Sequence, residues 1–144
     1  MNGEPISIGR RDMSAGHAPG TEPWAVAPDA PDAGLAPGVI DVDDYAHRLL
    51  DQARADARGK ASASLWHSDL QRIVGVALVA GGKLAPHASP PAATLHCLSG
   101  RMRLYTEDRE WICGAGQIVP IPPERHGVDC LEEGVFLLTV SLER

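Results

Sequence analysis

The pattern of apolar and polar positions divides the chain into a proline-rich start, one helix and a long series of strands. Residues 1–38 hold half of the 12 prolines, set among glycine, alanine and aspartate. Such a segment buries too little apolar surface to offset the entropy that its backbone loses on ordering. We therefore expect residues 1–38 to form a disordered or draped arm, and residues 39–144 to form a single folded domain.

A helix is predicted over residues 41–58. Asp41 is placed to cap its free amides, and Gly59 is placed for its C-cap. Apolar residues recur at i, i+3, i+4 and i+7 and form one stripe, which indicates a helix lying on the outside of a sheet. The stripe consists of Val42, Tyr45, Ala46, Leu49, Leu50 and Ala53.

From residue 60 onward the apolar period changes from helical to alternating or continuous, which is typical of strands. Turn residues separate the runs, and no crossover helix lies between them, so we expect an all-β antiparallel sandwich or barrel over residues 60–144. The run 62–67 is predicted to be an edge strand, and 71–80, apolar on both faces, a central one. Further strands are predicted at 92–98, 101–106, 110–113, 117–121, 128–130 and 135–142.

Charge and cysteine content narrow the choice of partners. The formal net charge of −6 argues against a nucleic-acid partner and against an anionic membrane surface. The three cysteines have no C-x-x-C spacing and are expected to be reduced, buried thiols. No apolar run is long enough to span a bilayer and no secretory pattern begins the chain, so we expect a cytoplasmic protein.

Two glycine-bounded segments carry the candidate chemistry: residues 81–100 hold His87, and residues 116–126 hold His126. These segments resemble the two signature motifs of the cupin superfamily. The first motif, G-x5-H-x-H-x3-E-x6-G, is matched in frame by Gly81, His87 and Gly100. The second, G-x5-P-x-G-x2-H, is matched by Gly116 and Pro122, with His126 one residue early. The resemblance covers roughly residues 60–144. It implies a jelly-roll β-barrel. Because cupin barrels commonly dimerise through edge strands, it also implies a homodimer.

A Thr-Leu-x-x-Leu-x-Gly strand and a terminal Leu-Leu-Thr-Val are further similar to a subgroup of small single-domain cupins. They stand here at 94–100 and 137–140.

The resemblance also implies a metal site, in which three histidines and one glutamate hold a divalent Fe, Mn, Ni, Cu or Zn ion. His87 and His126 occupy two of these positions, whereas Ser89 and Ala93 stand at the other histidine and at the glutamate. A site without metal is therefore the alternative.

His96 is a candidate third ligand beside His87 and His126. Strand alternation places residues 93, 95 and 97 inward and His96 on the opposite face. A bulge near Pro90-Pro91 would reverse that parity and turn His96 inward. The sequence leaves both arrangements open.

Other polar groups are expected near the barrel mouth. The predicted ligand-binding residues are Ser89, Gln71, Tyr105 and Arg125, and Arg72 and Glu124 lie in the same regions. The Arg125 guanidinium suits a carboxylate or phosphate on a ligand. Glu124 replaces a motif glycine, so the loop before His126 should differ from the usual one.

The sequence is compatible with two functions. One is an enzyme of the cyclase, isomerase or dioxygenase type that acts on a small organic metabolite, with His87 and His126 as catalytic residues that bind metal or transfer protons. The alternative is a non-catalytic ligand-sensing or binding cupin that has lost its metal. The fold alone does not choose between them.

Overall fold

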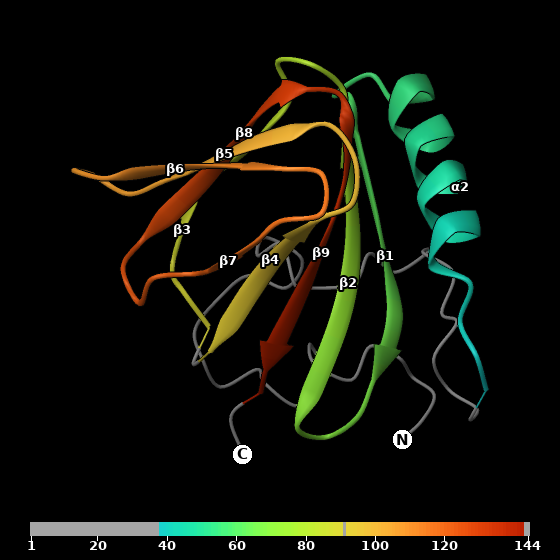
Figure 1. The fold of residues 1–144 in the computed structure, drawn as a ribbon, viewed down its shortest axis with the longest axis horizontal. Helices are drawn as coiled ribbons and strands as arrows, with labels where there is room; N and C mark the ends of the chain where they lie inside the picture. Colours follow the sequence, from blue (N-terminus) through green and yellow to red (C-terminus); the bar gives the residue numbers. More distant parts are fainter. Residues whose placement is uncertain (1–37, 91, 143–144) are drawn as a thin grey trace.

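The computed structural model describes residues 38–90 and 92–142. The arm predicted over 1–38 therefore lies, but for its last residue, outside the described residues. The described part consists of one helix and nine strands in two antiparallel sheets (Figure 1).

Helix α2 spans Val42–Ala55 and begins where the sequence predicts. The Asp41 carboxylate accepts a hydrogen bond of 3.0 Å from the Asp44 amide, as an N-cap does. The helix ends three residues before the predicted position 58, and Asp56, not Gly59, is its C-cap. The reason is local: the Asp56 carboxylate accepts the Arg58 amide at 2.6 Å, a turn that competes with helical hydrogen bonding.

The strands form two antiparallel sheets that face each other. One sheet has the order β1-β2-β9-β4-β7 and the other the order β3-β8-β5-β6. Their bounds are β1 Lys60–His67, β2 Gln71–Leu78, β3 Lys83–His87, β4 Ala93–Cys97, β5 Arg101–Tyr105, β6 Glu110–Gly114, β7 Ile118–Pro120, β8 His126–Glu132 and β9 Gly134–Ser141. This is the predicted antiparallel jelly roll, with its barrel made of two sheets; among the described residues no ladder joins one sheet to the other.

The edge and central strands lie where the apolar pattern places them. Strand β1 is at the edge of its sheet, and β2 pairs with β1 on one side and β9 on the other. The sequence prediction missed β3, because Lys83 and Pro86 interrupt its apolar pattern. Strand β3 is an edge strand with a register shift between Leu84 and His87, and irregular strands of this kind escape an alternation test.

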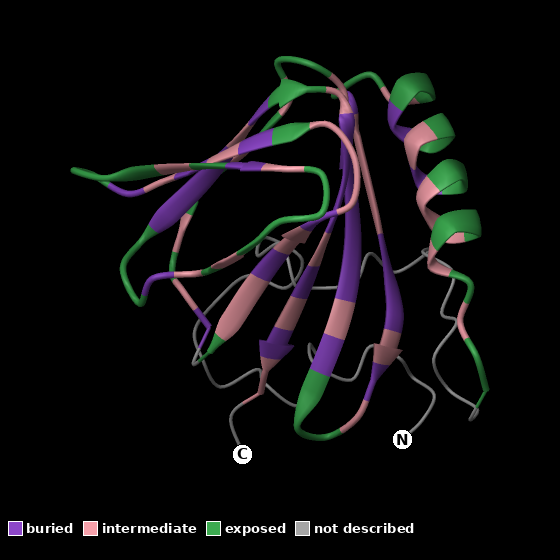
Figure 2. Ribbon diagram, in the orientation of Figure 1, coloured by how far each residue is buried: buried purple, intermediate pink, exposed green. Residues whose placement is uncertain are grey.

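The core lies between the two sheets, and strands of both sheets contribute buried residues to it (Figure 2). It is built almost entirely of aliphatic and sulfur-containing side chains: Val74, Val76, Leu78, Leu95, Cys97, Met102, Leu104, Cys113, Val128, Cys130, Phe136, Leu138 and Val140. All three cysteines are free and buried, as predicted. Burial raises the pKa of Cys97 and of Cys130 to about 11, so these thiols stay protonated.

Helix α2 covers the outer face of the larger sheet, which confirms its predicted position (Figure 1). Its buried side chains Leu49 and Ala53 pack on β1, β2 and β9 in a second, smaller apolar cluster. Gly75 permits the close approach, because a Cβ there would lie 2.8 Å from Leu49 Cδ1. Within residues 38–90 and 92–142, no helix has the length and apolar character needed to cross a bilayer.

Candidate functional site

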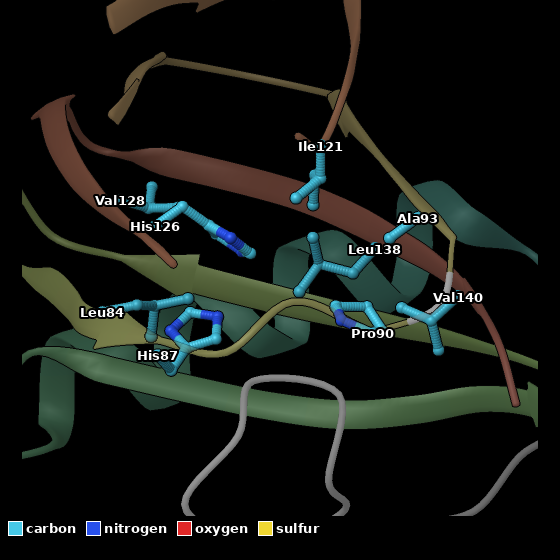
Figure 3. A pocket seen from close by; sticks show the side chains of 9 residues that line it. All are labelled: Leu84, His87, Pro90, Ala93, Ile121, His126, Val128, Leu138 and Val140. Carbon is cyan, nitrogen blue, oxygen red and sulfur yellow. The ribbon is translucent and has the colours of Figure 1, made fainter. Parts of the chain in front are cut away.

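A pocket opens between the two sheets, at the end of the jelly roll where β3 ends and β8 begins (Figure 3). The pocket is partly open to solvent. Apolar side chains form most of its wall, and two imidazoles supply the polar part. The lining residues are Leu84, His87, Pro90, Ala93, Ile121, His126, Val128, Leu138 and Val140.

The two motif histidines meet in this pocket. His87 is the last residue of β3 and His126 the first of β8, and the two are register partners across the sheet. Their ring centroids lie 4.5 Å apart and their planes are inclined by 66°. In Figure 3 both rings point into the cavity from one side, while Pro90 and Val140 stand across from them. The predicted meeting of His87 and His126 in one cavity is therefore observed.

Each imidazole is anchored in the same way. His87 Nδ1 lies 2.8 Å from the Ala85 carbonyl oxygen, and His126 Nδ1 lies 2.9 Å from that of Glu124. A carbonyl oxygen only accepts hydrogen bonds, so Nδ1 carries the proton in both rings. In the neutral imidazole the other nitrogen, Nε2, then holds the basic lone pair. The backbone thus sets one tautomer for the whole pair.

Both rings are held neutral near pH 7. Burial lowers the pKa of His87 to about 4, and the charges of His126 and Arg125 add to that lowering. Burial also lowers the pKa of His126. Since the two rings touch, a proton on one disfavours a proton on the other. The site consequently offers two uncharged imidazoles and takes up one proton at a time.

The residues present do not fit the metal set that the motif resemblance implies. The Ser89 hydroxyl donates to the Pro90 carbonyl at 3.1 Å and does not line the pocket, and Ala93 presents only a methyl group. No group of three or more His, Cys, Asp or Glu side chains suited to a metal ion occurs in the described part of the chain. Two imidazoles fall short of the three protein ligands that a catalytic metal uses.

The structure does not bring His96 to the pair. Its neighbours Leu95 and Cys97 are fully buried in the core, and Ala93 lines the pocket. Alternation along β4 therefore turns His96 to the outer face, and the reversed parity that a bulge would give is not observed. A site built from His87, His96 and His126 does not form.

The other predicted ligand-binding residues also lie outside the pocket lining. Gln71 is exposed at the start of β2. Tyr105 follows the buried Leu104, so it lies on the outer face of its sheet, where its ring contacts the Arg103 guanidinium at 4.5 Å. Arg125 is exposed, and its Nη2 donates to the Pro86 carbonyl at 3.0 Å. The structure thus gives Arg125 a partner within the chain.

Sequence reasoning overlooked the inward position of Arg72. This side chain is fully buried, and its register partner Val140 lines the pocket. The signal was present: Val74, Val76 and Leu78 face the core, so alternation along β2 turns position 72 inward and position 71 outward. Arg72, not Gln71, is the polar residue of β2 that turns inward.

The comparisons with known proteins concern the fold. No protein-family model matches the sequence, and no curated protein matches it. Among solved structures, an RmlC-like cupin from Shewanella frigidimarina is similar with a TM-score of 0.55 and 20% identity, over 61% of this chain and 80% of that one. A cupin superfamily protein from Desulfitobacterium hafniense is similar with a TM-score of 0.54 and 14% identity, over 58% and 78% of the two chains.

An HTH_3 family transcriptional regulator from Vibrio cholerae is also similar, with a TM-score of 0.51 and 20% identity. The match covers 59% of this chain and 52% of the regulator. At such identities the likeness shows the fold alone. The chain has the fold of the cupin superfamily.

Proposed function

We propose that this protein binds a small, mainly apolar organic metabolite in the pocket, and that His87 and His126 act on it by proton transfer as an enzyme of the isomerase or cyclase type. The observation that carries the proposal is the pair of touching, neutral imidazoles. Both have Nδ1 anchored to a carbonyl, which makes Nε2 the basic nitrogen of each ring.

The pair suits a shuttle that removes a proton from one atom of the substrate and returns it to another. One Nε2 takes the proton and the ring becomes an imidazolium, which exchanges its N–H protons with solvent and then returns one to the substrate, so no oxidant or reductant is consumed. Burial lowers the pKa of both rings, and neighbouring charges add to the lowering only at His87, so we assign the proton-accepting role to His126.

The lining indicates the class of substrate. Seven of the nine lining residues are apolar, so the skeleton of the ligand should be mainly hydrocarbon, with a polar group facing the imidazoles. A ketone or aldehyde with an acidic C–H beside its carbonyl meets both requirements. Dioxygenation, the third reaction type that the motif resemblance suggests, needs a redox centre for which the described donors do not supply a ligand set.

A non-catalytic binding or sensing module is the second candidate. Ser89 and Ala93, which stand where cupin metal ligands are expected, favour it, and so does the likeness to part of a transcriptional regulator. In that case the histidines would hold a ligand by accepting hydrogen bonds at Nε2.

Deuterium exchange distinguishes the two candidates. A panel of small ketones and aldehydes is screened for binding by ligand-observed NMR, and each bound compound is incubated with the protein in D2O. The enzyme predicts deuterium at the carbon beside the carbonyl, and loss of that exchange in His126→Gln. The matched control His96→Gln, altered on the outer face of β4, keeps it. Binding without any exchange would overturn the enzyme proposal and favour the module.

A further inference from the structure

The strand that carries His87 is irregular just before the histidine. Leu84 pairs with Val128 and His87 pairs with His126, so Ala85 and Pro86 together stand opposite one residue of β8. Pro86 has no N–H to give to the ladder. A bulge of this kind leaves the local backbone less constrained by strand pairing. The ladder alone therefore does not fix His87 against His126.

The Arg125 side chain connects β8 to this bulge of β3. The Nη2 atom of Arg125 donates to the Pro86 carbonyl oxygen at 3.0 Å. Arg125 directly precedes His126, and Pro86 directly precedes His87, so the hydrogen bond joins the two backbone positions next to the catalytic rings. It also lies beside both anchors, because the carbonyls that hold the imidazoles belong to Ala85 and Glu124.

We propose that Arg125 is a positioning residue that holds the β3 bulge against β8 and so keeps both imidazoles in register with their anchoring carbonyls. This inference rests on the proposed function, in which the shared tautomer is what makes the pair basic at Nε2. Arg125 is exposed and does not line the pocket, so it acts through the backbone and not on the substrate.

Loss of the Arg125 guanidinium should change the backbone next to His87. Without the guanidinium, the Pro86 carbonyl turns to solvent, the bulge relaxes, and the Ala85 carbonyl no longer faces His87 Nδ1. The ring then loses a hydrogen bond of the ordinary strength and the tautomer with the proton on Nε2 becomes populated. That tautomer cannot accept a proton at the nitrogen that the mechanism uses.

Long-range 1H–15N NMR of the 15N-labelled full chain tests this directly, because it reports which ring nitrogen carries the proton. In Arg125→Met we expect the Nε2–H to Nδ1–H ratio of His87 to rise about fivefold, the change that the loss of one hydrogen bond produces. Arg125→Lys retains a donor and should restore a ratio closer to that of the wild type.

The control is Arg101→Met. Arg101 lies on the same sheet, is half-exposed and pairs with Glu132, but it contacts no carbonyl next to a histidine. It should leave both rings unchanged. An unchanged ratio in Arg125→Met, or an equal rise in Arg101→Met, overturns the positioning role. If Arg125→Met fails to fold, Arg125→Lys and Arg125→Gln take its place. The Gln side chain is too short to reach the Pro86 carbonyl. Tautomer ratios equal to those of the wild type in both variants would likewise overturn the positioning role of Arg125.

Failure of the proposed function would look different. A wild-type protein with the proton on Nε2 in either ring would overturn the proton-transfer mechanism itself. A wild type with Nδ1–H in both rings and an Arg125→Met variant identical to it would overturn only the role of Arg125.

Discussion

Burial of the His87 ring makes the stability of the protein depend on pH. The folded-state pKa of His87 is about 4, against a usual value of 6.5. Between these values the unfolded chain binds the proton and the folded chain does not, so the free energy of unfolding falls as the solution becomes more acid. The contribution is fully present above pH 6.5 and is lost as the pH falls to about 4.

The size of the effect follows from the same two values. The fall of the His87 pKa from 6.5 to about 4 corresponds to about 3 kcal/mol over the whole window, of which about 2 kcal/mol is lost between pH 7 and pH 5. The His87 ring is half-buried, so solvent screens its charge only in part. A loss of this size is a large share of the stability of a typical domain.

Urea unfolding at pH 7 and pH 5 measures this loss of unfolding free energy in the wild type and in His87→Gln. The variant should lose about 2 kcal/mol less than the wild type between the two pH values. Asp56 and Glu133, whose pKa values are lowered by their ion pairs, titrate in both proteins and cancel in the difference. His96→Gln should follow the wild type. Parallel pH dependence of the wild type and His87→Gln would refute the buried, neutral ring.

Three further predictions concern packing, metal and assembly. Gly127→Ala places a Cβ 2.6 Å from the Tyr105 hydroxyl oxygen and should lower the free energy of unfolding in urea by about 1–3 kcal/mol. Gly114→Ala, whose Cβ would have its nearest contact at 3.5 Å, should leave the free energy of unfolding unchanged. Equal losses in the two variants would contradict the packing around Gly127. After dialysis against Zn2+ or Ni2+, elemental analysis should find less than stoichiometric metal, and a full equivalent that is lost in His87→Gln would contradict the donor set. The expected homodimer should be visible in sedimentation velocity experiments. Ile118→Lys should weaken the dimer, because Ile118 is 60% exposed on edge strand β7. A monomeric wild type would contradict the expected dimer.

Motif spacing predicted that His87 and His126 meet, whereas the other predicted site residues, Ser89, Gln71, His96, Tyr105 and Arg125, lie outside the pocket lining. Alternation along β4 already favoured an outward His96, and the glycine frame placed His87 and His126 together. Applied to β2, the same rule would have selected Arg72 over Gln71. These features depend only on local periodicity, which a sequence carries in full.

Other features depend on contacts that a sequence does not display. Strand β3 pairs only through an irregular ladder around Pro86, and the Arg125 partner lies 39 residues away along the chain. The helix end was placed too late because the Asp56 turn outweighs the helical propensity of the residues after it. Such contacts appear only once the strands are placed in space.

The most direct test of the account follows the Hε1 protons of His87 and His126 through one pH titration of the wild type. Both rings should be uncharged at pH 7, both midpoints should lie below 6.5 with His87 near 4, and the signal of each ring should shift when the other titrates. Two independent titrations with ordinary midpoints would contradict a buried pair that shares one pocket.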